Sequence, residues 1–206
     1  MAPQTAPPLI LKVGGSLVQS GRIDQIVPII ANSQRAVVIV PGGGEFADKV
    51  RDLQAALKFD DAAAHRLAML GMHQMADFLA SKHERFTIED SLEGIFLAIA
   101  DGRIPIWVPL PTLDGDDTIP ATWATTSDTI AARLAELLGG APLALLKSVS
   151  ARPEAGANQL SSEGVVDRAF PGIVARANIQ WRIFGPDDDA DVMSFLMTPD
   201  APVSKS

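Results

Sequence analysis

Short apolar runs alternate along the chain with longer segments of helical period, and this alternation constrains the fold more than any other feature. The candidate strands, rich in Val, Ile and Leu, lie at 9–13, 36–40, 104–108, 143–149 and 180–184. The helical segments between them lie at 22–33, 45–58, 60–82, 91–101 and 127–138. Strands that are apolar along their whole length are buried on both faces. The sequence therefore predicts the α/β fold class, as a three-layer αβα sandwich around a central, mainly parallel sheet.

We expect residues 1–206 to form a single domain, because no interior stretch has the composition of a linker. The two ends, 1–8 and 198–206, are polar and rich in proline, and we expect both to be flexible. The least periodic interior stretch, 150–170, is expected to be a mobile loop near the functional site.

The composition limits the partners that such a chain can bind. Acidic residues outnumber basic residues by 25 to 17, and the net charge of -8 argues against a nucleic-acid-binding surface. Cysteine is absent, which fits a reducing compartment. No apolar run approaches the about 18 residues that cross a bilayer, and the first residues lack the features of a secretory signal. We expect a cytoplasmic protein without a membrane partner.

Residues suited to ligand binding follow three of the predicted strands. They are Gly14, Gly15 and Ser16 after the first strand, Gly42, Gly43 and Gly44 after the second, and Lys147 and Ser148 near the end of the fourth. In parallel sheets, ligands bind beyond the carboxyl ends of the strands. Glycine amides at such positions, next to a helix N-terminus, suit a phosphate or another anion. The alternative is that both glycine runs are only tight turns. Neither run matches a P-loop or a dinucleotide-binding fingerprint.

Three charged residues lie where a purely structural role would be unusual. Lys12 and Lys147 stand inside apolar runs, where each side chain either reaches solvent past the strand or neutralises a transferring phosphoryl group. Asp128 opens a predicted helix, where it either complements the helix dipole or orients cationic groups or Mg²⁺ at phosphates.

We expect no metal site built from protein side chains. His65, His73 and His83 are spaced eight and ten residues apart, which does not make a ligand pair on one helix turn, so they are expected to be structural or surface residues. The acidic runs at 114–117 and 187–191 do not match a calcium-binding loop, and we expect them to be solvated.

Four segments taken in order resemble the amino acid kinase superfamily, the fold of acetylglutamate, uridylate, aspartate and isopentenyl phosphate kinases. The segments are LKVGGSL, VIVPGGGEFADKVR, TSDTIAARLA and LLKSV, within about the first 150 residues. The resemblance implies a kinase that binds Mg-ATP over its C-terminal half and a small-molecule phosphate acceptor over its N-terminal half.

The resemblance also implies roles for individual residues. Lys12 would stabilise the transferring phosphoryl group, and Asp128 would organise the catalytic lysines. Gly14, Gly15 and Ser16 would donate to phosphate oxygens, Gly42, Gly43 and Gly44 would hold the acceptor, and Lys147 and Ser148 would lie by the nucleotide. The second catalytic lysine of acetylglutamate kinases has no clear equivalent, so Lys147, Arg152 or Arg168 would replace it.

A second departure from the family pattern concerns the acceptor. Isopentenyl phosphate kinases read GGGSFGH where this chain has Asp48 at the final position. A carboxylate there would repel a bare phosphate and pair with an ammonium group, so we expect the acceptor to carry an amine. Three segments, PGGGEFADKVR, AHRLAMLGMHQMADFLA and LLKSV, look most like the short kinases of methanofuran-type cofactor synthesis in one-carbon metabolism. Those kinases use ATP to convert an aminomethylfuran-methyl phosphate to its diphosphate.

Two other interpretations stay open. One is a kinase of the same fold with a uridylate, isopentenyl phosphate or amino acid acceptor. The other is a nucleotide-binding or storage protein without turnover, because a fold does not fix a function. The apolar residues of the helix at 62–80 exceed what one buried face needs, which favours a homodimer or higher homo-oligomer.

Overall fold

The computed structural model describes residues 7–152, 154–199 and 203, and within them six strands form one sheet. The strand order is β3-β4-β2-β1-β5-β6, and every neighbouring pair is parallel. The strands are β1 (Leu9–Val13), β2 (Val37–Pro41), β3 (Phe86–Glu89), β4 (Ile104–Trp107), β5 (Leu143–Leu146) and β6 (Trp181–Phe184). The predicted α/β fold with a parallel sheet is therefore confirmed.

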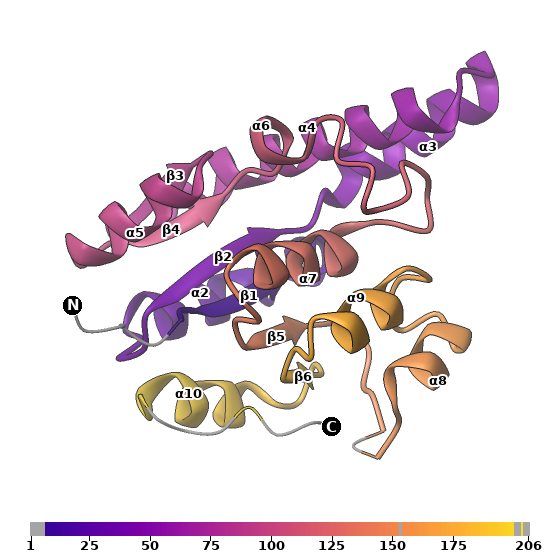
Figure 1. The fold of residues 1–206 in the computed structure, drawn as a ribbon. Coiled ribbons are helices and arrows are strands. Elements are labelled where there is room, and N and C mark those ends of the chain that lie inside the picture. The colour runs from indigo at the N-terminus through magenta and orange to yellow at the C-terminus, as the bar shows by residue number, and fades with distance from the viewer. Residues whose placement is uncertain (1–6, 153, 200–202, 204–206) are drawn as a thin grey trace.

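Helices connect the strands and cover both faces of the sheet (Figure 1). They are α1 (Ser16–Gln19), α2 (Ile23–Ala31), α3 (Gly44–Leu57), α4 (Asp61–Ala80), α5 (Leu92–Ala100), α6 (Leu110–Leu113), α7 (Ser127–Leu137), α8 (Ala157–Ser162), α9 (Phe170–Arg176) and α10 (Asp189–Met197). None of the helices in the described part of the chain has both the length and the apolar character needed to cross a bilayer.

The five predicted strands and five predicted helices are all present, but the structure contains further elements. Helices α1, α6, α9 and α10 were not predicted. Strand β3 was not predicted; it is a four-residue edge strand with only one fully buried residue, so it lacks a continuous apolar run. The predicted strand at 143–149 ends at Leu146, because the residues at 148–150 are exposed. The predicted loop at 150–170 contains helix α8. The predictions for 1–8 and 198–206 fall mostly on residues outside the described part, although Val203 is buried.

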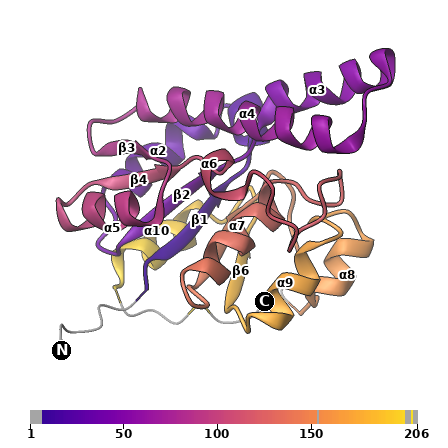
Figure 2. The ribbon, with the colours of Figure 1, turned by 45° about the horizontal axis from the view of Figure 1, so that its top comes forward.

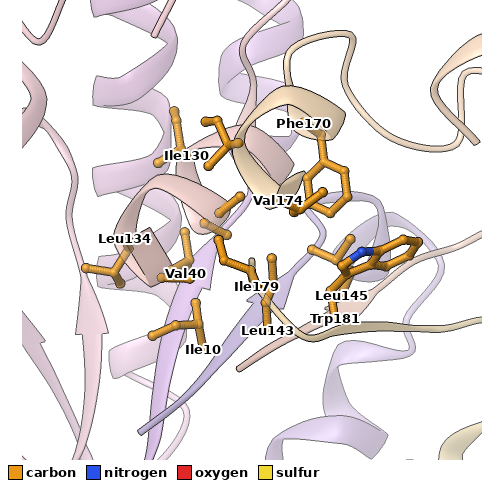
Figure 3. Close-up of a cluster of buried hydrophobic side chains, with 14 of the residues drawn as sticks. Ile10, Val40, Ile130, Leu134, Leu143, Leu145, Phe170, Val174, Ile179 and Trp181 are labelled. Atoms are coloured by element: carbon orange, nitrogen blue, oxygen red, sulfur yellow. The ribbon is translucent and has the colours of Figure 1, made fainter. Parts of the chain in front are cut away.

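The alternation of side chains along β1 divides the core into two layers. Ile10 points to one face, where it packs with residues of α7 and α9 (Figure 3). Leu9 and Leu11 point to the other face, where they pack with residues of α2 and α10. In the first layer the rings of Phe170 and Trp181 meet edge to face with centroids 5.6 Å apart, an arrangement worth about 0.5–1.5 kcal/mol beyond the buried area.

Helices α3 and α4 form a helical hairpin that projects beyond the carboxyl end of β2 (Figures 1 and 2). Helix α3 ends where Lys58 takes a left-handed backbone conformation, with φ of 60°. Helix α4 begins after Asp60, whose side chain accepts a hydrogen bond from the amide of Ala63 at 2.7 Å. The sharp turn places the start of α4 beside the loops that follow β1 and β2, where the candidate site lies.

Candidate functional site

The two glycine runs pack directly against each other at the ends of β1 and β2. The amide of Gly42 donates to the carbonyl of Val13 at 2.8 Å, which extends the β1–β2 pairing beyond the strands. A Cβ atom on Gly15 would lie 2.3 Å from the Cα atom of Gly44, and a Cβ atom on Gly42 would lie 2.6 Å from the amide nitrogen of Gly15. Tight turns alone do not require this approach. Glycine is needed here because the two backbones meet without room for side chains.

One backbone amide of these runs is hydrogen-bonded to the sheet, and several others are not hydrogen-bonded within the described residues. Gly14 donates to the carbonyl of Leu146 at 3.3 Å, so its N–H is not available to a ligand. Within the described residues, four further amides have no hydrogen-bond partner; they belong to Gly15, Ser16, Gly43 and Gly44. Unpaired backbone donors at the starts of helices attract anions, since the helix dipole adds to them. The arrangement therefore suits phosphate oxygens.

Lys12 reaches the same region from inside the sheet. It shares the face of β1 with Ile10, and that face is covered by α7, whose second residue is Asp128. The Lys12 ammonium lies 2.8 Å from Oδ1 of Asp128. A Cβ atom on Gly14 would lie 3.3 Å from Nζ of Lys12, so the glycine at this position leaves room for the ammonium group.

Lys147, the first residue after β5, supplies a second ammonium group to the same carboxylate. Its Nζ atom lies 2.7 Å from Oδ2 of Asp128. Each carboxylate oxygen of Asp128 thus contacts a different lysine, and the three side chains are between 3% and 16% exposed. The sequence placed the three residues at strand and helix ends, and the structure brings them together.

The charges in this cluster shift its pKa values. Burial alone would raise the pKa of the Asp128 carboxyl, but Lys12 and Lys147 outweigh it and hold that pKa below its usual range. Burial lowers the pKa of Lys147, and the neighbouring charge of Lys12 lowers it further, against the opposing effect of Asp128. With two cations for one anion, the cluster carries excess positive charge in a site with little water.

Asp167 holds the N-terminus of α7, and its role was not predicted. Its carboxylate accepts hydrogen bonds from the amides of Thr126 and Thr129, each at 2.9 Å, and from the Thr126 hydroxyl at 2.5 Å. Thr126 stands at the N-cap position of the helix, but its own side chain forms no capping hydrogen bond. Burial and the charge of Asp128 raise the pKa of Asp167. A distant carboxylate that replaces a local cap leaves no signal in the sequence.

A cleft of about 270 Å³ opens between the glycine runs, α4 and the segment before α7. Its wall includes His65, which was predicted to be structural or on the surface. Burial lowers the pKa of His65, although a hydrogen bond with the Thr125 backbone opposes this shift. Thr125 also lines the cleft, and its buried hydroxyl has no partner in the described part of the chain. Apolar side chains of Met69, Met72 and Ile130 complete the inner wall.

The mouth of the cleft carries both charges. Asp48 lines it with a side chain that is 62% exposed, and Nη1 of Arg51 lies 3.6 Å from the Asp48 carboxylate. The Arg51 guanidinium also stacks over the ring of Trp123, 4.2 Å from its centroid. The Trp123 ring is fixed by a 2.6 Å hydrogen bond to Gln54. The Asp48 charge is therefore partly balanced by a cation that lies on the surface.

Other predicted candidates lie away from the cluster. Arg152 pairs with Glu163 on the surface, and Arg168 lines a second, open cleft beside Trp123 and α8. Among the residues that the structure describes, Lys147 alone joins Lys12 at the Asp128 carboxylate. Ser148 is exposed and does not line the first cleft.

The described residues contain no group of three or more His, Asp or Glu side chains arranged to hold a metal ion. The acidic runs are less solvated than predicted. Asp116 forms a mostly buried pair with Arg133 at 2.8 Å. Asp189 accepts hydrogen bonds from the buried Arg22. Both carboxylates pair with arginines that are distant in the sequence, so their local sequence does not predict these ion pairs.

Comparisons with known proteins agree on one family and fold. Residues 7–151 match the model of the amino acid kinase family. A protein of Methanocaldococcus jannaschii named [5-(aminomethyl)furan-3-yl]methyl phosphate kinase is 30% identical over 131 residues, which make up 63% of this chain and 60% of that protein.

Two solved structures share the fold at low identity. Uridylate kinase from Archaeoglobus fulgidus superposes with a TM-score of 0.64 at 18% identity, over 92% of this chain and 95% of that chain. An isopentenyl phosphate kinase superposes with a TM-score of 0.62 at 14% identity, over 94% of this chain and 97% of that chain.

Proposed function

The chain belongs to the amino acid kinase family, and from this membership we propose that it transfers the γ-phosphoryl group of Mg-ATP to a small phosphate monoester. The observation that carries the proposal is the buried Asp128, which holds Lys12 and Lys147 beside backbone amides without partners. Phosphoryl transfer needs positioned cations and hydrogen-bond donors more than a covalent intermediate.

The reaction divides the work among the residues of the cluster. An oxygen of the acceptor phosphate attacks the γ-phosphorus, the bond to the bridging oxygen breaks, and its electron pair leaves with ADP. Lys12 and Lys147 neutralise the charge that spreads over the transferring group and the leaving oxygen. The amides of Gly15 and Ser16 bind phosphate oxygens of the nucleotide, and those of Gly43 and Gly44 bind the acceptor phosphate. Asp128 contacts both lysines and fixes their positions.

Mg²⁺ enters this scheme as part of the nucleotide. The carboxylates nearest the lysines are already engaged: Asp128 with Lys12 and Lys147, and Asp167 with the start of α7. The phosphates of ATP would therefore hold the ion, as is common for Mg²⁺, which keeps most of its water ligands.

For the acceptor, we propose an amine-bearing phosphate monoester, of which [5-(aminomethyl)furan-3-yl]methyl phosphate is the leading candidate, converted to its diphosphate. Two observations support it. The Methanocaldococcus jannaschii relative is named for that substrate, and Asp48 places a carboxylate in the cleft that the two glycine runs also line. A phosphate at the glycine runs would leave an ammonium group on the same small molecule free to approach Asp48.

An acceptor panel tests this function. ADP release from Mg-ATP is measured with the furan phosphate, uridylate, isopentenyl phosphate and acetylglutamate. Turnover with the furan phosphate at a kcat/KM at least about a hundredfold above the others supports the proposal. Preference for another acceptor would support the proposed kinase activity but contradict the proposal that the acceptor carries an amine. Saturable ATP binding without turnover on any acceptor would favour a nucleotide-binding protein.

Asp48→Asn tests the amine contact itself. Loss of a charge pair worth ~1.4 kcal/mol raises KM for the amine-bearing acceptor about tenfold and leaves kcat unchanged. Asp52→Asn is the matched control, because Asp52 is an exposed carboxylate on the same helix that does not line the cleft. An unchanged KM in Asp48→Asn would remove the argument for an amine.

We also propose that the chain forms a homodimer through the outer face of α4. Of the apolar residues on the helix that was expected to form an interface, Met69, Met72 and Met75 are buried within the chain. Leu67 and Leu70 are about 40% exposed and available to a partner. Gel filtration at micromolar concentration should give the mass of a dimer, and Leu67→Glu should shift it to that of a monomer. A monomer mass for the unmodified chain would contradict this assembly.

A further inference from the structure

Arg22 is a buried arginine outside the cleft that hydrogen-bonds the backbone of Lys147. It precedes α2 and is only 7% exposed. Its Nη1 donates to the carbonyl of Lys147 at 2.8 Å. Its Nε and Nη2 donate to the Asp189 carboxylate at 2.8 and 2.5 Å. One guanidinium therefore joins the segment after β1, the end of β5 and the start of α10.

The contact falls at the first residue after β5, where the sheet still holds the chain through one hydrogen bond. The amide of Lys147 donates to the carbonyl of Phe184 at 2.9 Å, which continues the β5–β6 pairing. The carbonyl of Lys147 accepts a hydrogen bond from Arg22. The next three residues, 148–150, are exposed. Arg22 thus fixes the second polar group of the peptide chain at Lys147, just before the chain leaves the sheet.

The position of the Lys147 side chain depends on that backbone. Its ammonium group must reach Asp128 across the cluster, and a shift of about 1 Å in a catalytic group can lower a rate about a hundredfold. A lysine in the middle of a strand, such as Lys12, is held on both sides by neighbouring strands. Lys147 lies one residue beyond β5, and the sheet holds it only through its amide, so the Arg22 contact supplies the second backbone support.

We propose that Arg22 is the positioning residue for Lys147: it fixes the backbone from which the second lysine of the site extends, and Asp189 holds Arg22 in place. Arginine suits this task because its planar fork can donate to a carboxylate and to a carbonyl at the same time. The assignment rests on the phosphoryl-transfer role proposed above for Lys147.

The test compares Arg22→Gln with Arg85→Gln. Arg85 is a matched control, because it also donates to backbone carbonyls, those of Ala31 and Gly102, but lies at the opposite ends of the strands. Both variants should unfold at lower urea concentration than the unmodified chain. Only Arg22→Gln should lower kcat, by about tenfold or more, with KM for ATP changed less than about twofold. Asp189→Asn should give a smaller loss of kcat in the same direction.

A second readout does not depend on activity. Acetylation of each lysine by acetic anhydride is followed by peptide mass spectrometry, with Lys82 as the internal reference because its side chain is 31% exposed. Lys147 should react slowly in the unmodified chain and in Arg85→Gln, and several-fold faster in Arg22→Gln and Asp189→Asn. If Lys147 reacts equally in all four proteins, or if Arg22→Gln keeps the kcat of Arg85→Gln, Arg22 is only a structural residue. If the unmodified chain has no kinase activity, the labelling still decides whether Arg22 positions Lys147.

Discussion

Asp128→Asn removes the charge on which the proposed chemistry depends while keeping the size of the side chain. The Asp128 carboxylate lies 2.8 Å from the Lys12 ammonium and 2.7 Å from the Lys147 ammonium, in side chains no more than 16% exposed. The variant leaves two ammonium groups facing each other with little water. Removal of one partner from a buried ion pair costs about 3–5 kcal/mol, so we expect urea unfolding to show a stability lower by ~3 kcal/mol.

The stability loss of this variant should depend on pH. Burial lowers the pKa of Lys147, Lys12 lowers it further, and Asp128 opposes both. Without Asp128 the pKa falls again, so the folded variant binds fewer protons than the unfolded chain between that pKa and about 10.4. Stability therefore rises with pH across this window. The deficit relative to the unmodified chain should be largest at neutral pH and smaller near pH 10.

The activity of the same variant gives the sharper result. We expect kcat for ADP release to fall at least about a hundredfold, or ~2.7 kcal/mol, since both lysines lose the carboxylate that fixes their positions. Asp116→Asn is the control, because Asp116 also forms a mostly buried ion pair, with Arg133, outside the cleft. It should lose stability and keep kcat. If Asp128→Asn kept the kcat of this control, the claim that Asp128 organises the lysines would be refuted.

Three further predictions follow from the packing around the site. Gly15→Ala would place a Cβ atom 2.3 Å from the Cα atom of Gly44, so it should lower stability by about 1–3 kcal/mol and weaken ATP binding. The control Gly172→Ala adds a Cβ atom that meets nothing within 4 Å among the described residues, so it should do neither. Equal calorimetric results for the two variants would contradict the close packing. Thr125→Val removes a buried hydroxyl without a partner, so it should raise stability by about 1 kcal/mol in urea unfolding. If the acceptor uses that hydroxyl, KM for the acceptor should rise as well; a loss of stability would show that the hydroxyl has a partner. Because burial raises the pKa of Asp167, the folded chain binds more protons than the unfolded chain above about pH 4, and stability should fall as pH rises from there. Asp167→Asn should remove this fall when unfolding is measured against pH. An unchanged pH profile in the variant would contradict the prediction.

The sequence was sufficient to predict five of the six strands, and the placement of Lys12 and Lys147 near strand ends, because both depend on local patterns. Apolar runs defined five strands, and the positions of Lys12 and Lys147 followed from charges inside those runs. Strand β3 was not predicted because it is a partly exposed edge strand and therefore lacks such a run.

The residues that support the site could not be predicted, since they act across the fold. Asp167 holds the start of α7 from 38 residues away or more, and Arg22 reaches Lys147 across 125 residues. His65 was expected to be a structural or surface residue, and the turn between α3 and α4 places it in the cleft wall. Contacts between residues that are far apart in the chain produce no local sequence pattern, so one sequence does not predict them.

The measurement that tests the central claim most directly is the rate of ADP formation from Mg-ATP and the furan phosphate by Lys12→Ala, with ATP affinity measured by calorimetry on the same sample. Lys82→Ala, which removes a surface lysine paired with Asp24, is the control. We predict that Lys12→Ala loses at least about a hundredfold in kcat, while its ATP affinity falls far less and the control keeps both. A Lys12→Ala variant with the kcat of the control would contradict phosphoryl transfer at this cluster.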